Sequence, residues 1–523
     1  MKVIGLDFGT TNSIVSFFNE KTQNIEAWKM GGTDGNNYIP SCISFEDDEI
    51  YIGEEAKSNL ARGDSQTYAN FKILLHEKDA KKLANYNYKS IAPKEITKQY
   101  MKTLLELYKK EQNISTIDSL VITVPEIWIQ DDMQSRSGIM EIANELSLPL
   151  TKLVSEPVAA GAYFINNYKK RNNKTYNGHL LIFDYGGGTL DISLLEANDD
   201  AIQTLERTGK GKDSITIGKA GVAYDELVVM SLYKDTFNKE LKKNSEEYHE
   251  LLVDFEREKI QNRTRIEKFV KQYEKNAKLN RDIFSLRCES GKISVTPKIL
   301  VECFDELLKD DLKSSLKEIE RYFKIRGLNT NNHDEFRIVM VGGFSNYYLS
   351  EKAVRDFFDS KTDSDRRFET HFTLEDTTLA ISKGATLIAN EYVKLDETYP
   401  MSIGIVFYTI NSNAERVEIR DTIFQKGDEI SINEIIYSKH TIVGSGKPTL
   451  FFDNGRTSYK IKVEKNPEEI FPNSNNEANE WEIGFSVDKN SFYYIHIKDK
   501  TGEIINTEIG NVIEDYKDSI IVE

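Results

Sequence analysis

The sequence has few cysteines and lacks the long apolar runs of membrane-spanning and secreted proteins. It has only three cysteines, and Cys42, Cys288 and Cys303 lie far apart. This spacing argues against a disulfide framework and a cysteine metal site, and it favours a reducing compartment. No uncharged apolar run is long enough to span a bilayer, and the apolar residues before Asp7 are too few for a signal-peptide core. We therefore expect a cytoplasmic protein without a membrane partner.

An excess of positive charge is also missing. The formal net charge is −17, which argues against a nucleic-acid partner. The sequence contains neither a Gly-x-x-x-x-Gly-Lys-Ser/Thr phosphate loop nor a Gly-x-Gly-x-x-Gly dinucleotide loop. A hydrophobic content of 39% is enough for ordinary cores, and 523 residues predict two or three domains.

One pattern is present twice: an apolar strand, an aspartate, a turn of glycine and threonine, and a second strand. The first copy contains Asp7, Gly9, Thr10, Thr11 and Asn12, and the second contains Asp184, Gly186, Gly187, Gly188, Thr189 and Asp191. Glycines let backbone amides approach an anion closely, and each strand-end aspartate can hold a divalent metal through water. Two such turns facing each other would clamp a nucleoside triphosphate. Taken alone, the first turn has an ordinary hairpin as its alternative.

A third glycine-rich turn follows the apolar run 338–341 and contains Gly342, Gly343 and Ser345. It is either a tight strand-to-helix turn or a flat surface for a nucleoside base and ribose. Small residues after Pro157 and around Gly384 predict two closely packed helices, whose crossing would make a hinge between lobes.

The remaining organisation follows from charge and periodicity. Residues 233–282 are highly charged and lack proline and glycine, which predicts two solvent-facing helices, a hairpin without direct chemistry. After about residue 393, apolar and polar residues alternate with period two, as in 481–488 and 493–498. This pattern predicts an all-β sandwich. We expect a nucleotide-binding domain at 1–391, a linker at 392–399 and a β-sandwich at 400–523, with no helical segment after it.

Taken together, these motifs resemble those of the 70-kDa heat-shock (DnaK-type) chaperone family, within the actin and sugar-kinase superfamily. The segments that carry the resemblance are 7–13, 184–191, 341–345, the two small-residue helices and parts of the β unit. The resemblance implies an actin-like ATPase domain of two α/β lobes with duplicated ribonuclease-H-like sheets, followed by the sandwich. It also implies ATP or ADP with Mg²⁺ as cofactors, and an extended or unfolded polypeptide as partner. A J-domain co-chaperone and a nucleotide-exchange factor are further implied partners.

The resemblance also suggests roles for single residues. Lys72 aligns with a lysine that orients the γ-phosphate and attacking water, although from the residue alone a solvated surface lysine is the simpler interpretation. Glu156 and Asp184 match acidic residues near metal and water, and Asp7 matches a metal-side carboxylate. The implied catalytic set is Lys72, Glu156, Asp184 and Thr189, with Mg²⁺ held through water by Asp7 and Asp184. The implied nucleotide-binding set is completed by the residues of the three glycine turns and by Lys278.

The chain departs from the family pattern at several positions. Asn346 stands where the family usually has an arginine that stacks on the base, so the packing of the base must differ. The helix near Glu274 and Lys278, expected to contact adenine, matches only loosely. The linker has few apolar residues, and the helical lid of the family is not expected after the β unit.

We therefore predict a chaperone-like protein that hydrolyses ATP and binds extended polypeptide. The alternative is a nucleotide-sensing module with little hydrolysis and one dedicated protein partner. A small-molecule kinase or a filament-forming protein fits less well, because neither explains the β-sandwich.

Overall fold

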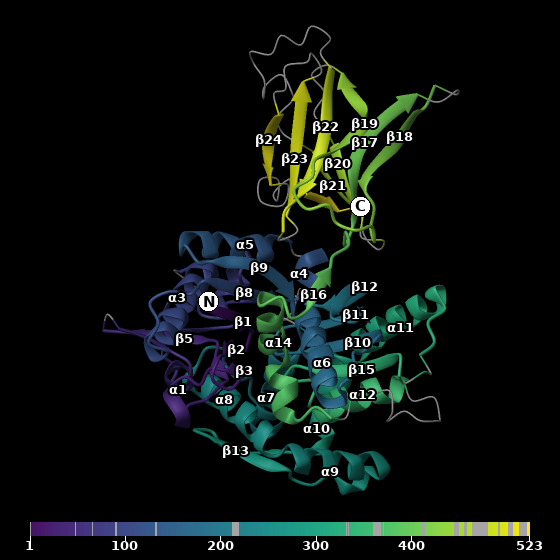
Figure 1. The fold of residues 1–523 in the computed structure, drawn as a ribbon. Helices are drawn as coiled ribbons and strands as arrows, with labels where there is room; N and C mark the ends of the chain where they lie inside the picture. Colours follow the sequence, from purple (N-terminus) through teal and green to yellow (C-terminus); the bar gives the residue numbers. More distant parts are fainter. Residues whose placement is uncertain are drawn as a thin grey trace. The chain divides into compact units, whose positions relative to one another are not determined.

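The computed structural model describes residues 2–522 except 48, 65, 89–90, 131–132, 212–218, 331, 333, 359–367, 370, 411–413, 444–448, 454, 456–457, 463–479, 490–491, 500–505 and 512–519. The chain divides into two compact units (Figure 1). Unit 1 contains residues 1–127 and 138–395, and unit 2 contains residues 128–137 and 396–523.

Unit 1 is built around two sheets of the same plan. In the first, β1 (Val3–Phe8) pairs antiparallel with β2 (Asn12–Asn19) and parallel with β8 (Ser119–Val124). In the second, β10 (Gly178–Tyr185) pairs antiparallel with β11 (Leu190–Asn198) and parallel with β15 (Phe336–Val341). The outer strands of the two sheets are β3 (Asn24–Ala27), β4 (Ile39–Pro40), β9 (Leu150–Ser155), β12 (Ala201–Lys210) and β16 (Lys394–Asp396). This duplicated α/β plan is the one expected from the sequence.

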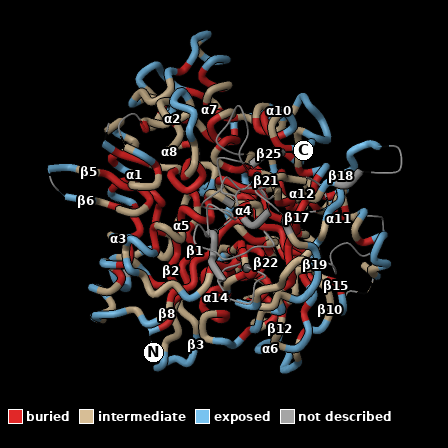
Figure 2. Tube along the Cα trace, turned by 90° about the horizontal axis from the view of Figure 1, so that it is seen from above, coloured by how far each residue is buried: buried red, intermediate tan, exposed pale blue. Residues whose placement is uncertain are grey.

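The central strands are apolar because they are covered on both faces. Every residue of β1 is buried, and so are the last six residues of β10. Strands buried on both faces need continuous apolar runs rather than alternation. Figure 2 shows buried residues along the central strands and exposed residues on the outer loops and helices.

Two helices rich in small residues pack closely against each other between the sheets. They are α6 (Glu156–Asn172) and α14 (Leu374–Ala389). A Cβ at Gly384 would overlap the backbone carbonyl of Ala159, so α14 needs glycine at this crossing. The serine cap of α6 and the capping box of α14 fix where each helix begins. The predicted contact between these helices is confirmed.

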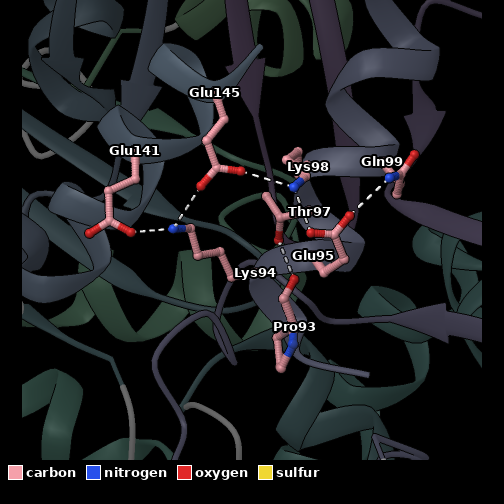
Figure 3. Close-up of polar contacts among 8 residues, drawn as sticks. All are labelled: Pro93, Lys94, Glu95, Thr97, Lys98, Gln99, Glu141 and Glu145. Carbon is pink, nitrogen blue, oxygen red and sulfur yellow. Dashed lines mark hydrogen bonds and ion pairs between the residues drawn. The ribbon is translucent and has the colours of Figure 1, made fainter. Parts of the chain in front are cut away.

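A network of ion pairs joins α3 (Pro93–Glu111) to α5 (Met133–Glu145) on the surface of this unit (Figure 3). Lys94 pairs with Glu141 and also lies 3.2 Å from Glu145. Lys98 lies 2.9 Å from Glu145 and 2.7 Å from Glu95. Such partly exposed pairs stabilise a protein by at most about 1 kcal/mol each.

The charged stretch 233–282 contains α8 (Glu246–Gln261) and α9 (Arg263–Lys275), and it begins in the last turn of α7 (Gly221–Phe237). The expected helices are present, but the prediction that they only face solvent is wrong. Leu251 and Phe255 of α8 and Ile266 of α9 are buried in the core of the second sheet. One face of this charged segment therefore contributes apolar side chains to the core.

Unit 1 contains further elements around the two sheets. Its other helices are η1 (Gly32–Asp34), α1 (Glu54–Ala61), α2 (Ala80–Ala84), η2 (Ala277–Leu279), α10 (Pro297–Leu307), α11 (Lys309–Arg326) and α12 (Tyr348–Phe358), and α4 (Ile127–Gln130) begins at its edge. Its other strands are β5 (Cys42–Glu46), β6 (Glu49–Ile52), β7 (Thr67–Ala69), β13 (Phe284–Cys288) and β14 (Gly291–Val295). Among the described residues, no helix is long and apolar enough to cross a bilayer.

Unit 2 contains two antiparallel sheets that pack on each other. The strands of the first are β17 (Ser402–Ile410), β18 (Arg416–Phe424), β20 (Thr449–Asp453), β21 (Ser458–Lys462) and β25 (Ile520–Val522). The strands of the second are β19 (Ile436–Val443), β22 (Glu480–Val487), β23 (Tyr493–Asp499) and β24 (Asn506–Asn511). Phe424 of the first sheet contacts Phe485 and Tyr493 of the second. The predicted β-sandwich is confirmed, with Ile483 and Ile495 fully buried between its sheets.

The segment 392–399 contains a short strand. Val393 is buried, and Lys394–Asp396 form β16 at the edge of the second sheet beside β12. The backbone N–H of Lys394 donates to the carbonyl of Asp200. Backbone pairing does not need apolar side chains, so a polar linker sequence can still attach to this edge.

Candidate functional site

The two copies of the strand-turn-strand pattern occupy equivalent places in the two sheets. Asp7 lies at the end of β1, opposite Thr123 of the parallel strand β8. Asp184 lies at the end of β10, opposite Val341 of the parallel strand β15. Since the turn that follows each aspartate lies at the same edge of its sheet, the duplicated plan places both turns beside one cavity, which they line together.

Two glycines of the second turn leave the space that side chains of the first turn occupy. A Cβ at Gly187 would overlap the hydroxyl oxygen of Thr11, and a Cβ at Gly188 would overlap that of Thr10. The two turns are therefore in contact, and a side chain at either glycine would push them apart. A Cβ at Gly186 would meet no atom within 4 Å. That position leaves room for an anion close to the backbone.

The cavity between the two halves of unit 1 has a volume of about 390 Å³. It is lined by most of the residues expected from the sequence: Asp7, Gly9, Thr10, Thr11, Asn12, Lys72, Glu156, Asp184, Gly186, Gly187, Gly188, Thr189, Gly342 and Gly343. A cavity of this size suits a ligand of nucleotide dimensions.

Four buried charged groups lie in the part of the cavity that the two glycine turns line. The ammonium group of Lys72 lies 2.5 Å from a carboxylate oxygen of Glu156, and Asp7 and Asp184 line the same region. Burial and the charge of Glu156 raise the pKa of Asp7 to about 7. The positive charge of Lys72 offsets part of this rise. Burial and the charges of Glu156, Asp191 and Asp7 raise the pKa of Asp184 well above its usual value.

These carboxylates fit a divalent cation that is held in part by other ligands. Buried carboxylates with raised pKa values gain most from a nearby positive charge, and Mg²⁺ prefers oxygen ligands. Among the described residues, no group of three or more acidic, histidine or cysteine side chains is arranged to hold a metal. Magnesium commonly keeps water and phosphate oxygens among its ligands.

Three residues of the expected set do not line the cavity. Asp191 is fully buried, and one of its oxygens accepts a hydrogen bond from the backbone N–H of Ile127. The hydroxyl of Ser345 accepts a hydrogen bond from the backbone N–H of Tyr185, beside Asp184. Asp191 and Ser345 therefore fix backbone next to the cavity through hydrogen bonds and do not face the cavity themselves. Lys278 is exposed in η2 and is not among the residues that line the cavity.

One face of the α8–α9 segment lines the cavity and was not expected. The lining residues recur every three or four positions: His249, Leu252, Val253, Glu256, Lys259, Ile260 and Arg263. The residues up to Ile260 lie on one face of α8, and Arg263 is the first residue of α9. The signal was present in the sequence, but the high charge of the stretch favoured a solvent-facing interpretation.

Lys259 is held in the cavity wall by a buried carboxylate. Its ammonium group lies 2.6 Å from both carboxylate oxygens of Asp225, which belongs to α7. It also lies over the rings of Phe344 and Tyr347, at 5.4 Å and 5.9 Å from their centroids. Burial raises the pKa of Asp225 to about 6, and the charge and hydrogen bond of Lys259 offset part of this rise.

One ion pair and one hydrogen bond connect the α1 side of the cavity to the α7–α8 side. Lys57 of α1 lies 2.6 Å from Glu256 of α8. Tyr86 donates a hydrogen bond to Glu226 of α7, and Lys243, which follows α7, pairs with the same carboxylate. The Lys57–Glu256 and Tyr86–Glu226 contacts join the two halves of unit 1.

Comparison with known proteins assigns this fold and cavity to one family. The model of the family described as Hsp70 protein matches residues 3–507. The chaperone protein DnaK of Metamycoplasma hominis is 25% identical over 512 residues, which cover 95% of this chain and 77% of that protein. Heat shock cognate 70 kDa protein 3 of Dictyostelium discoideum is 24% identical over 536 residues, which cover 96% of this chain and 79% of that protein.

Other relatives match over a shorter region. The chaperone protein DnaK of Ureaplasma parvum serovar 3 is 28% identical over 263 residues, which cover 50% of this chain and 40% of that protein. The chain thus spans about two fifths of the length of this relative. The family model covers nearly the whole chain, whereas the identity to these relatives is 24–28%.

Proposed function

The chain belongs to the Hsp70 protein family, and from that premise we propose that it is a chaperone that binds and hydrolyses ATP and couples hydrolysis to the binding of extended polypeptide. The observation that carries this proposal is the pair of glycine turns in contact across a cavity that also contains Lys72 and Glu156. Phosphoryl transfer to water depends mainly on positioning and charge neutralisation, and these residue types supply both.

Each residue of the site has a role in the proposed reaction. The backbone N–H groups of the two turns, with Thr10, Thr11 and Thr189, bind the phosphate oxygens. Lys72 orients the terminal phosphoryl group and the attacking water, and Glu156 holds the lysine in place. A magnesium ion held through water by Asp7 and Asp184 would supply the positive charge that neutralises the phosphates.

The proposed polypeptide site belongs to the β-sandwich. In β18, an edge strand, Val417 and Ile419 are 38% and 44% exposed. Exposed apolar side chains beside an unpaired strand edge support binding of an extended segment by backbone hydrogen bonds and side-chain contacts. The proposal includes the domain boundaries 1–391, 392–399 and 400–523, a cytoplasmic location, and a J-domain co-chaperone and nucleotide-exchange factor as partners.

The test is steady-state ATP turnover by the full chain with Mg²⁺, with and without an unfolded polypeptide. We expect measurable turnover that rises when the polypeptide is added, and loss of turnover in Lys72→Ala. No turnover in either condition would remove the enzymatic part of the proposal. Turnover that is equal in the wild type and Lys72→Ala would point to a contaminating ATPase.

The second candidate is a nucleotide-sensing module that hydrolyses ATP slowly and binds one dedicated partner. The polar character of the linker favours it, because Lys394 and Asp396 are exposed. Binding of a peptide library to the full chain separates the two functions. Broad selection of apolar peptides supports the chaperone, whereas no selection supports the dedicated partner.

A further inference from the structure

A short segment at the end of β8 is bonded to one carboxylate beside each turn. The hydroxyl of Thr123 donates to Asp7 at 3.2 Å, and the backbone N–H of Ile127 donates to Asp191 at 3.1 Å. Thr123 and Ile127 are four residues apart in the sequence, and neither of them lines the cavity. The separation of the two turns therefore depends on the position of this one segment, which continues a strand of the first sheet.

Glu126, in the same segment, is bonded through both of its carboxylate oxygens. One oxygen lies 2.7 Å from a guanidinium nitrogen of Arg207 in β12, and the other accepts a hydrogen bond of 2.9 Å from the hydroxyl of Ser193 in β11. Ser193 and Arg207 lie directly opposite each other in the pairing of these two strands. Glu126 and Ser193 are buried, and the side chain of Arg207 is only 14% exposed. These three residues, here called the Glu126 cluster, join the end of β8 in the first sheet to two strands of the second sheet.

Strand β11 connects the Glu126 cluster to the second turn. The strand begins directly after Thr189, and Asp191 and Ser193 are its second and fourth residues. The turn itself is closed by a hydrogen bond from the backbone N–H of Gly186 to the carbonyl of Thr189. A shift of β11 relative to residues 126–127 therefore moves Thr189, which lines the cavity, relative to the first turn.

The buried ion pair of the Glu126 cluster supplies direction rather than stability. Two charges taken out of water lose their solvation, and the replacement of a buried pair by apolar side chains of similar volume is often neutral or stabilising. An apolar contact has no preferred direction, so it lets neighbouring segments slide past each other. The two bonds of Glu126, one to each strand, fix the end of β8 relative to β11 and β12 together. A buried pair therefore suits a place where a distance has to be kept constant.

We propose that Glu126 and Arg207 are positioning residues for the hydrolysis of ATP. They hold the start of β11 against the end of β8, so that Thr189 keeps a fixed distance from the first turn. The Glu126 cluster does not line the cavity. Its loss should therefore slow the chemical step, which is sensitive to misplacements of about 1 Å, more than it weakens nucleotide binding. This inference rests on the proposed function and adds to it two residues that do not touch the nucleotide.

The experiment compares the full-length wild type with the double variant Glu126→Leu/Arg207→Met, in which apolar side chains replace the ion pair. We expect the melting temperature to stay close to that of the wild type and MgADP affinity in calorimetry to change by less than about 2-fold, while single-turnover ATP hydrolysis falls about 10-fold or more. In the nucleotide-free chain, hydrogen exchange of the Ile127 amide should become faster, because its bond to Asp191 opens more often.

Two single variants and a control complete the set. Glu126→Gln keeps an acceptor for Ser193 but loses the charge, so it should slow hydrolysis less than the double variant does. Arg207→Lys keeps the charge without the planar fork and should recover part of the rate. The matched control is Lys169→Met, because Lys169 lies 2.7 Å from Asp200, directly before β12, and does not line the cavity. The control should change neither hydrolysis nor exchange.

The outcomes separate this inference from the proposed function. If the wild type does not hydrolyse ATP, both fail. If the wild type hydrolyses ATP and the double variant does so at the same rate, this inference fails and the proposed function stands. Equal losses of hydrolysis and MgADP affinity would give the Glu126 cluster a structural role only and would also overturn the inference. Should the double variant not fold, Glu126→Gln decides in its place by the same comparison.

Discussion

The ammonium group of Lys72 lies 2.5 Å from the carboxylate of Glu156, and both side chains are buried. Lys72 comes from the segment after β7, whereas Glu156 is the first residue of α6. An ion pair this buried costs desolvation energy and is stable only while both partners are present. The pair explains how a lysine that resembles a surface residue in the sequence is held inside the cavity.

Replacement of Lys72 should affect turnover and stability separately. We expect Lys72→Ala to lower single-turnover ATP hydrolysis by on the order of 10²-fold or more. It should also lower the free energy of unfolding by about 3–5 kcal/mol, because Glu156 loses its partner. The double variant Lys72→Ala/Glu156→Gln should recover stability in urea without recovering hydrolysis. Lys98→Ala, which removes a partly exposed ion-pair lysine on the surface, is the control. A double variant as unstable as the single one would contradict the argument.

The contact between the two turns predicts unequal effects of two similar substitutions. Gly187→Ala adds a methyl group that overlaps the side chain of Thr11, whereas Gly211→Ala adds one outside the cavity lining, in ordinary contact with Ile127 at 3.4 Å. We expect Gly187→Ala to weaken MgADP binding by at least 10-fold because the turns must separate, an energy of about 1.4 kcal/mol or more. Gly211→Ala should retain binding to within a few-fold. Isothermal titration of both variants provides the comparison, and equal losses would mean that the contact is unimportant.

The parts of the site that the sequence predicts are those whose residue types are set locally. A turn that approaches a phosphate needs glycine at particular positions, and an aspartate at a strand end is visible beside it. The apolar runs before Asp7 and Asp184 likewise require strands with two covered faces. These local requirements are sufficient to predict the duplicated plan and the phosphate-like end of the cavity.

The residues that the sequence did not predict depend on tertiary packing. A charged helix face, such as that of Glu256 and Lys259, has the same pattern whether water or a cavity covers it. The pairing of Lys259 with Asp225 joins residues 34 positions apart, and nothing local indicates it. The expected contact from Lys278 came from a loose resemblance of a neighbouring segment. Arg263 and Lys259 occupy the cavity wall instead.

Acid should destabilise the chain through His249. Burial lowers the pKa of His249 to about 4 from its usual value of 6.5. Between pH 6.5 and pH 4 the unfolded chain binds a proton at this site and the folded chain does not, so stability falls as the pH falls. In urea unfolding at pH 7.5 and pH 5.0, His249→Asn should lose less stability than the wild type. An NMR titration in which His249 protonates near pH 6.5 would rule this out.

The ion pair between Lys57 and Glu256 should control how fast the nucleotide leaves. It connects α1 and α8 across the cavity with a separation of 2.6 Å, and both side chains are 22% exposed. A partly exposed pair contributes up to about 1 kcal/mol, so we expect Lys57→Ala or Glu256→Gln to speed release of a fluorescent ADP analogue by about 2–5-fold in stopped flow.

The charge-reversed double variant Lys57→Glu/Glu256→Lys separates the ion pair from the individual side chains. If attraction between α1 and α8 slows release, the reversed pair should restore a rate close to that of the wild type, and high salt should reduce the difference between wild type and single variants. Lys271→Ala is the matched control, because Lys271 pairs with Glu267 on the same helix and does not line the cavity. Release that stays fast in the double variant would show that the two side chains act independently, for example through contacts of Glu256 with the nucleotide itself.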